Sequence, residues 1–493
     1  MVERRSPKPN AGGSSPSTPA KLSLLAGVVL SLLAALPFAF AVRPQMADYP
    51  SHLARYHIML DGGRSPFLAK YYSFNWALSG NLGVDLLMVP LGRTLGAESA
   101  AYLIALLLPV LLALGIVAVE WALRGRIGVG ALLALATVWS PSMALGFANF
   151  SLALALALFA FALWIRLEGR AWRAALFVPL GVIVWLCHSA GWGVLGVLVF
   201  GYEWHRRHDW RALLAPWPLF PPFVLLALGQ RVGDTLRYGD FPLWYKLGIW
   251  VKALAETTML LDIASVFILL AAIGLAFLRR RLDGRLGWAA LLVALLAVVM
   301  PRHFGGGDLA DARLVPVALM LGCLAIDMPA KRSLLCLAAS LFLVRLAVTC
   351  ADWRAQSLVL ERALTALESV PQGAQIAAAV PHVPGTWDDP PLTHAGSYAT
   401  VYRDALVNTH FALPGVHMLT VRGMDAGFAD PSQRIEARAG EPVDLSHFAP
   451  AAHADYLWYV GGNPVGRLPA GAAVLHRVPG SLLVRLANPS RGR

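Results

Sequence analysis

An acidic residue and a short helical pattern follow directly after the first long apolar stretch of the chain. Residues Asp48 to His57 read Asp-Tyr-Pro-Ser-His-Leu-Ala-Arg-Tyr-His. Pro50 suits the first turn of a helix, because its missing N–H would have no partner there. At helical spacing His52 and Arg55 share one face, and Asp48 stands just before the helix begins. The pattern predicts an interfacial helix with a carboxylate at its N-terminal end.

Asp48 allows two interpretations. A carboxylate at a membrane surface can take the proton from an acceptor hydroxyl, provided that its pKa suits that task. The simpler interpretation is that Asp48 caps the helix and is stabilised by the helix dipole. The sequence leaves both open.

A second polar segment reads Pro-Arg-His-Phe-Gly-Gly-Gly-Asp-Leu-Ala-Asp-Ala-Arg, from Pro301 to Arg313. Its consecutive glycines allow the backbone to approach a ligand closely. Two acids, Asp308 and Asp311, stand among arginines and a histidine, which is more polar than a connector beside a membrane requires. We favour a functional loop, and a flexible turn held by salt bridges is the alternative.

Other polar residues stand beside apolar stretches. The run from Gln230 to Glu256 is basic and aromatic. Interfacial Trp and Tyr belts would explain its aromatic residues, and a lipid phosphate site would explain the bases too. Asp85, Asn149 and His188 are candidates for a polar cavity, because ionisable groups at membrane depth are costly unless paired. The simpler interpretation of Asn149 is a polar residue at a helix end, and that of His188 is a satisfied core histidine.

These residues must be positioned by membrane helices. The chain has 493 residues, of which 57% are hydrophobic and 14% charged, and its mean hydropathy is +0.59. A spanning helix needs about 20 mostly apolar residues, and we count about eleven such stretches. We predict helices at roughly 22–42, 99–123, 127–141, 147–167, 173–187, 190–204, 212–229, 257–278, 286–301, 313–329 and 333–350.

Basic residues give the predicted topology. Residues 1–20 read as a disordered cytoplasmic tail that carries Arg4, Arg5 and Lys8. Alternating sides then places every short basic loop on the cytoplasmic face, as expected for a bacterial inner-membrane protein. The net charge of +12 reflects these loops, so we expect no nucleic-acid partner. The longer loops at 43–98, 230–256 and 302–312 fall on the outer face.

The composition changes after residue 351. No Lys follows Lys331, and Pro and Gly separate short β-like runs. We therefore predict a membrane domain at 21–351 and a small mixed α/β periplasmic domain at 352–493. The domain's histidines lack metal-ligand spacing. These are His382, His394, His410, His417, His447, His453 and His476.

The order of parts resembles the GT-C superfamily of membrane glycosyltransferases, which take sugars from polyprenyl-phosphate donors. It has a first helix, an outer loop that opens with an acid and an interfacial helix, further helices and an extracytoplasmic domain. The resemblance covers roughly residues 20–350. In that superfamily the acid of the first outer loop is the proposed catalytic base, and Asp48 is the matching position. Many members carry a second acid beside it, where this chain has Tyr49, so a divalent metal is left open.

The resemblance implies an α-helical polytopic membrane protein of GT-C type. It would move a sugar from a polyprenyl-phosphate, within the membrane lipid, to a lipid, glycan or protein acceptor on the periplasmic face. Transfer from a lipid phosphate needs a base on the acceptor side and cations around the departing phosphate. The candidate cations are His52, Arg55, Arg231, Arg237, Lys246, Lys252, Arg302, His303 and Arg313.

Two other classes of function fit the same composition. A carrier or flippase for a lipid-linked glycan would need a path of ionisable residues through several helices. Here the helices are mostly Leu, Ala and Val, and the polar residues gather at one face. A non-catalytic assembly protein for envelope glycans is the third hypothesis. The asymmetry of polar residues favours chemistry at the outer surface.

Overall fold

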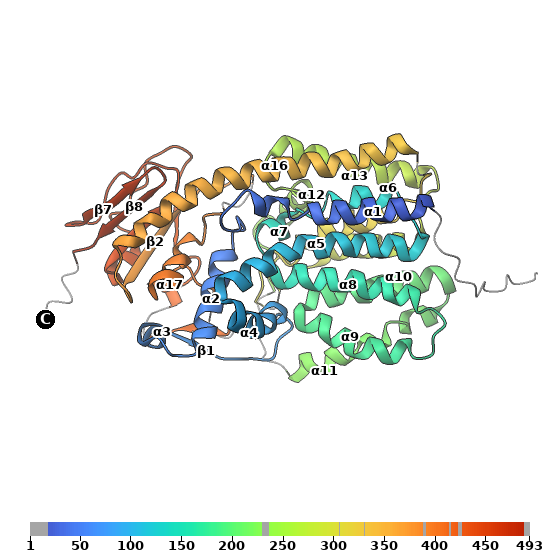
Figure 1. The fold of residues 1–493 in the computed structure, drawn as a ribbon, viewed down its shortest axis with the longest axis horizontal. Helices are drawn as coiled ribbons and strands as arrows, with labels where there is room; N and C mark the ends of the chain where they lie inside the picture. Colours follow the sequence, from blue (N-terminus) through green and yellow to red (C-terminus); the bar gives the residue numbers. More distant parts are fainter. Residues whose placement is uncertain are drawn as a thin grey trace, which may run out of the picture.

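The computed structural model describes residues 18–228, 236–304, 306–329, 331–387, 391–413, 416–422 and 426–487. Figure 1 shows a bundle of roughly parallel helices with the C-terminal sheet at one end. The bundle contains α1 (Thr18–Leu33), α5 (Ala97–Arg124), α6 (Val129–Leu135), α8 (Ala148–Arg166), α9 (Arg173–Cys187), α10 (Ser189–Arg207), α13 (Met259–Leu278), α14 (Gly284–Val299), α15 (Leu314–Leu324) and α16 (Arg332–Leu364).

Four described helical segments are long and apolar enough to cross a membrane: α5, α8, α13 and the continuous helix Arg332–Ser369 formed by α16 and η4 (Thr365–Ser369). Shorter apolar helices accompany them, in α1, α9, α14 and α15. The chain is therefore a polytopic membrane protein by length and composition, while the predicted number of eleven spans is not confirmed.

Three predicted spans are interrupted in the structure. In the stretch 22–42, α1 ends at Leu33 and η1 (Leu36–Ala39) follows after a turn. The stretch 127–141 is not one helix, because α6 ends at Leu135 and α7 (Pro141–Ala144) begins after a turn. Pro141 disfavours helical backbone at the preceding residue. The stretch 212–229 holds η2 (Trp210–Leu214), η3 (Trp217–Leu219) and the short α11 (Pro221–Leu228). Its four prolines remove helical hydrogen bonds.

The segment between α1 and α5, most of which the predicted topology places on the outer face and which we call the outer segment, folds as a series of short elements. Their bounds are η1 (Leu36–Ala39), α2 (Tyr49–Asp61), α3 (Pro66–Tyr71), β1 (Tyr72–Phe74) and α4 (Gly83–Leu95). The helix predicted after Asp48 is confirmed as α2, which ends at Gly62 in the left-handed conformation that glycine adopts without strain.

The C-terminal region holds a mixed sheet, as its sequence predicts, with strand order β3-β2-β6-β8-β7. β2 pairs in parallel with β3, β5 and β6, whereas β8 is antiparallel to β6 and β7. The elements are β2 (Gln375–His382), η5 (Ala395–Ser397), α17 (Tyr398–Arg403), β3 (Leu406–Val407), β4 (Leu419–Val421), η6 (Ala426–Phe428), β5 (Arg434–Glu436), η7 (Ala449–His453), β6 (Tyr456–Val460), β7 (Ala473–Val478) and β8 (Ser481–Arg485).

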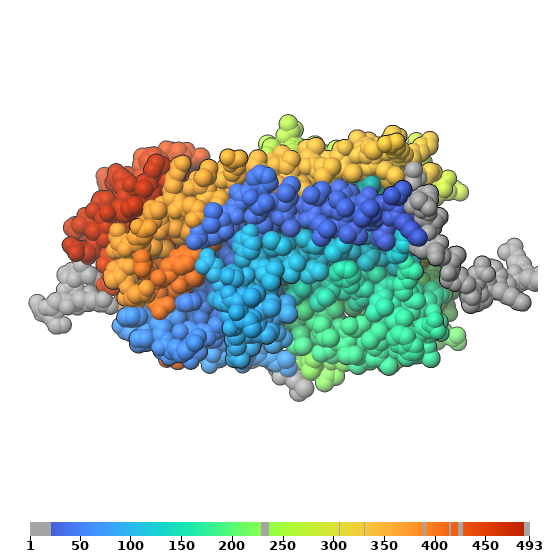
Figure 2. Space-filling model, viewed as in Figure 1, coloured from blue at the N-terminus to red at the C-terminus, as the bar shows by residue number. Residues whose placement is uncertain are grey.

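The N-terminal outer segment and the C-terminal region form one unit. β1 pairs antiparallel with β4, with Ser73 opposite Thr420. α2 packs against α17 and η5. Figure 2 shows the blue outer segment in close contact with the orange C-terminal residues. This docking brings Asp48, which precedes α2, beside residues of the C-terminal region that lie more than three hundred positions away in the sequence.

A buried ionic network joins α16 to this outer end. Arg345 in α16 donates to Asp262 at 2.7 Å and to Glu256 at 3.3 Å. Asp262 also accepts from the indole N–H of Trp387, in the C-terminal region, at 2.8 Å. A charge at membrane depth is tolerated only when it is paired. The contact with Trp387 places this network at the domain end of the bundle.

Candidate active site

Asp48 occupies the N-cap position of α2, but its side chain makes no capping hydrogen bond. The main chain fixes its position instead, because the N–H of Ala47 donates to the carbonyl of Ala144 at 3.2 Å and that of Asp48 to Leu145 at 2.9 Å. The carboxylate is 15% exposed. The structure therefore does not support the interpretation of Asp48 as a side-chain cap.

Gly146 makes the close approach of these two segments possible. Its φ of +85° lies in the left-handed region, and a Cβ there would stand 3.2 Å from the Cβ of Met46 and 3.6 Å from that of Asp48. Both facts favour glycine, which has no Cβ to clash. The connection before α8 therefore packs closely against Met46 and Asp48.

His394, at the start of η5, brings the C-terminal region to this carboxylate. Its Nδ1 lies 3.1 Å from the carbonyl oxygen of Ala47 and 3.6 Å from Oδ1 of Asp48. Its Nε2 lies 3.2 Å from Oδ1 of Asp430. Asp430 in turn accepts from the side-chain amide of Gln433 at 2.8 Å. The imidazole of His394 therefore lies between the carboxylates of Asp48 and Asp430.

Both ring nitrogens of His394 face oxygen atoms that only accept hydrogen bonds. A neutral imidazole has one N–H, so only the imidazolium satisfies both contacts. Burial would lower the pKa of His394, but Asp430 and Asp48 outweigh it and hold the pKa above its usual value. Burial likewise opposes ionisation of Asp430, yet its hydrogen bond to His394 keeps the pKa of Asp430 below its usual value. A buried positive charge therefore stands beside Asp48.

Arg313 is a second cation whose charge interacts electrostatically with the Asp48 carboxylate. It directly precedes α15, and its guanidinium stacks 3.9 Å from the ring centroid of Phe147. One terminal nitrogen donates to the carbonyl of Asp308 at 3.0 Å, and the other contacts Nε2 of His188 at 3.2 Å. Its buried Nε has no hydrogen-bond partner within the described residues.

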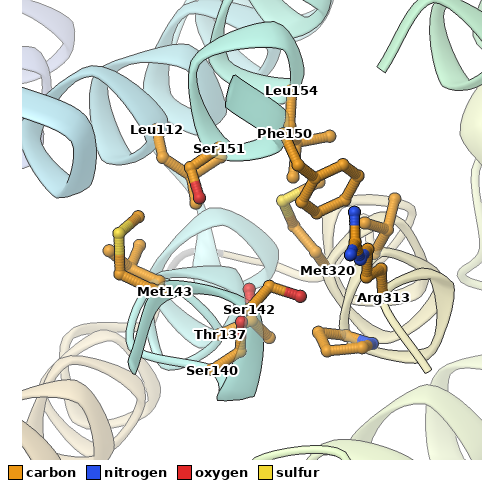
Figure 3. A pocket seen from close by; sticks show the side chains of 13 residues that line it. Leu112, Thr137, Ser140, Ser142, Met143, Phe150, Ser151, Leu154, Arg313 and Met320 are labelled. Carbon is orange, nitrogen blue, oxygen red and sulfur yellow. The ribbon is translucent and has the colours of Figure 1, made fainter. Parts of the chain in front are cut away.

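A small cavity adjoins Arg313. The hydroxyls of Thr137, Ser140, Ser142 and Ser151 line it together with apolar side chains of α5, α8 and α15. Figure 3 shows Arg313 on one side of the space and the serines of the α6–α7 connection on the other. Its volume of ≈ 10 Å³ has room for about one water molecule.

Other charges of the 301–313 loop are paired within it. Arg302 makes two hydrogen bonds to Asp308, at 2.9 and 3.0 Å, and His303 lies 3.2 Å from the same carboxylate. Asp311 is fully buried and accepts from Tyr245 at 3.1 Å and from Lys246 at 2.5 Å. These pairs fit the alternative of a salt-bridged turn, and Arg313 is a cation of the loop that interacts electrostatically with Asp48.

The remaining candidates of the outer loops lie in separate places. The backbone of Arg237 pairs with that of His303, and Lys246, in α12 (Pro242–Val251), also donates to two backbone carbonyls. Lys252 donates to the carbonyl of Thr386 at 2.7 Å. Arg231 lies outside the described residues.

Arg55 and Asp85 form a buried ion pair, with nitrogen and oxygen 3.0 Å apart. Asn149 donates to Asp85 at 3.4 Å and accepts from the backbone of Val84 at 2.6 Å. The pair ties α2 to α4, so phosphate binding by Arg55 is a prediction that this geometry does not favour. His52 is partly buried beside Phe411, and burial together with Arg55 keeps its pKa well below the usual value, so it is neutral.

We expect the Arg55–Asp85 pair to be essential for stability. Arg55→Met leaves a buried carboxylate without its cation and should cost about 3–5 kcal/mol of unfolding free energy. Thermal unfolding of the purified protein in detergent measures this. The matched variant Arg55→Met/Asp85→Leu removes both charges and should recover more than half of the loss. A double variant as unstable as the single one would contradict this role.

His188 has a capping role and a contact with the site. As the N-cap of α10, its Nδ1 accepts from the N–H of Ala190 at 3.1 Å, while Nε2 faces Arg313. A neutral imidazole has one acceptor nitrogen, so only one of the two contacts is a full hydrogen bond. The sequence interpretation of His188 as a satisfied histidine is consistent with these contacts.

The sequence did not single out His394 or Asp430 for catalysis. His394 was one of several scattered histidines, and no spacing along the chain connects it with Asp48. The sequence signal that could have pointed to His394 is the polar segment around η5 and α17. That segment contacts α2 only because the C-terminal region docks there. Within the described residues no group of three His, Cys, Asp or Glu side chains is arranged to hold a metal ion.

Comparisons with known proteins give limited similarity. No family model matches the chain, and no curated protein does. It is similar to the crystal structure of ArnT from Cupriavidus metallidurans bound to undecaprenyl phosphate, with 11% identity, 95% of this chain and 98% of that chain covered, and a TM-score of 0.49. The apo structure of the same protein gives 14% identity, coverage of 72% and 71%, and a TM-score of 0.40. At these values neither structure assigns an activity to this chain.

Proposed function

We propose that this protein is an integral-membrane glycosyltransferase that moves a sugar from a polyprenyl-phosphate donor to a lipid, glycan or protein acceptor at the outer face of the membrane. The observation that carries the proposal is that Asp48, where the helix bundle meets the C-terminal region, lies 3.6 Å from His394 and interacts electrostatically with Arg313. The order of parts that resembles GT-C glycosyltransferases supports the same class.

Asp48 has the position of a general base. It takes the proton of the acceptor hydroxyl while the oxygen bonds to the anomeric carbon of the sugar. The bond from that carbon to the phosphate oxygen breaks, and the polyprenyl-phosphate leaves with the electron pair. Arg313 neutralises the charge that develops on the phosphate, from a partly buried position in which such a cation acts strongly. The acceptor proton ends on Asp48 and is passed to water.

His394 is a positioning residue in this scheme. Its imidazolium keeps the adjacent carboxylate ionised, and Asp430 holds the ring in place. Because the pKa of His394 is raised, the charge is present below that pKa and is lost as the pH rises through it. The same titration removes the charge–charge contacts of His394 with Asp48 and Asp430 at alkaline pH, while the packing of the C-terminal region against α2 remains.

We expect His394→Gln to change the pH dependence of transfer. The neutral amide removes the positive charge, so the base is protonated more easily and the acidic limb of kcat/KM moves upward by about one pH unit. A pH profile of the purified enzyme measures this, with His447→Gln, in the same domain, as the matched control. An unchanged acidic limb would show that His394 serves the fold alone.

Transport of a lipid-linked glycan is the competing hypothesis. The Arg345 network is an ionisable cluster of the kind that such a path needs, but its contact with Trp387 places it at the domain end of the bundle. That position favours chemistry at the surface. Reconstitution in vesicles distinguishes the two functions, because a flippase scrambles lipid without any acceptor, whereas a transferase consumes the donor.

The test of the proposed function uses the host itself. The gene is deleted, restored as wild type, and the sugars and masses of envelope glycans and glycolipids are compared. A sugar that disappears on deletion and returns on restoration supports transfer. Envelope glycans that are identical in all three strains would contradict it.

A further inference from the structure

We infer that the end of the bundle remote from the C-terminal sheet carries a binding site for the phosphate of an anionic membrane lipid. This site is independent of the function proposed at Asp48. It is a cavity of ≈ 320 Å³ lined by residues of α8, α9, α10, η2 and η3. Figure 1 shows α8, α9 and α10 in the bundle, with the C-terminal sheet at its opposite end. The predicted topology places the end that holds the cavity on the cytoplasmic face.

Four arginines line the cavity: Arg170, Arg173, Arg207 and Arg211. Guanidinium groups suit phosphate oxygens because their planar N–H pairs match two oxygens at once. The arginines come from the α8–α9 connection, the first turn of α9, the last turn of α10 and η2. The cavity is therefore lined by segments that are separate in the sequence.

One buried carboxylate organises two of these arginines. Glu203 is fully buried and lies 3.1 Å from a guanidinium nitrogen of both Arg173 and Arg207. It also accepts from the indole N–H of Trp164 at 3.0 Å, and Arg173 stacks 3.9 Å above the Trp164 ring. These contacts hold the two side chains at the wall before any ligand arrives.

The other two arginines leave the cavity positive. Among the described residues, no salt bridge involves Arg170 or Arg211. Nearby acids have other contacts, since Glu168 pairs with Arg206 and Asp209 accepts the backbone N–H of Arg211 at 3.0 Å. An anion that enters the cavity meets donors that the protein does not neutralise.

An apolar ridge beside the cavity favours a lipid over a free phosphate ion. η2 and η3 expose Trp210 (65%), Leu213 (59%) and Trp217 (55%), and Trp217 also lines the cavity. Exposed tryptophan and leucine next to basic residues are typical of the membrane interface. Acyl chains can lie on this ridge while the phosphate occupies the cavity, as in basic pockets that bind anionic lipid headgroups.

Binding of a fluorescent short-chain phosphatidylglycerol to the full-length protein in neutral detergent tests the inference. Arg170→Gln/Arg211→Gln should weaken binding by at least about tenfold, because it removes the two guanidinium groups that line the cavity and that no acid neutralises. Both side chains are exposed, so the fold should persist, and thermal unfolding checks this. The control is Arg279→Gln/Arg332→Gln, which removes the same charge from the same end of the bundle outside the cavity and should leave affinity within about twofold.

Competition identifies the source of the phosphate. Unlabelled phosphatidylglycerol should displace the probe, while phosphatidylcholine and inorganic phosphate should do so far more weakly. Inorganic phosphate that competes as well as the lipid would overturn the lipid assignment in favour of a soluble anion. Equal affinity of the wild type and the Arg170/Arg211 variant would overturn the site itself.

Discussion

Asp48→Asn is expected to lower the rate of sugar transfer by about 10²- to 10⁴-fold, the usual contribution of a positioned general base. The amide has nearly the same shape, and the main-chain bonds that fix this residue do not involve the carboxylate. The protein should therefore keep its amount and its thermal stability. In the deletion strain, the variant should fail to restore the sugar that the wild type restores.

Asp61→Asn is the matched control for this variant. Asp61 ends the same helix and accepts backbone hydrogen bonds from Gly63 and Ser65, at the end of α2 away from the site. It should restore the envelope sugar as the wild type does. Full restoration by Asp48→Asn would show that another group acts as base.

Arg313→Gln is expected to have the second-largest effect, a loss of about 10²- to 10³-fold in the rate of transfer. Its cation interacts electrostatically with Asp48 and would stabilise the charge on the departing phosphate. Arg302→Gln is the control, because Arg302 is paired with Asp308 and is 36% exposed. We expect a loss of less than about tenfold there.

Because Arg313 is partly buried, its loss could also affect folding. Arg313→Lys keeps the charge and separates the two effects. We expect it to recover part of the activity with higher KM, since a lysine offers no planar pair of donors. Equal rates for Arg313→Gln and Arg302→Gln, with both variants folded, would contradict the assigned role of Arg313.

The local parts of the fold could be predicted from the sequence. Uninterrupted apolar stretches gave α5, α8 and α13 within a few residues, and Pro50 after an acid gave the start of α2. The hydrophobic pattern did not show that α6 would end at Leu135, because Ala, Thr, Val and Trp continue the apolar run. Pro141 restricts helical backbone only at the residue before it, Ser140, so it does not account for the end of α6 at Leu135.

The candidate site depends on contacts that local patterns do not contain. Asp48 could be selected because it precedes a helix after an apolar stretch. Its neighbours His394 and Asp430 could not, because docking of the C-terminal region decides which histidine reaches it. Arg302 and Arg313 looked equivalent in sequence, and only the pairing of Arg302 with Asp308 separates them.

The measurement that tests the central claim most directly is turnover of a polyprenyl-phosphate-linked sugar by the purified protein in vesicles of membrane lipid. Free polyprenyl-phosphate is followed with acceptor extract from the deletion strain, for the wild type, Asp48→Asn and Asp61→Asn. We expect release of the lipid phosphate with the wild type and Asp61→Asn, and at most about one-hundredth of that rate with Asp48→Asn. Equal release by all three proteins would contradict Asp48 as the base, and movement of donor across the bilayer without release would contradict sugar transfer.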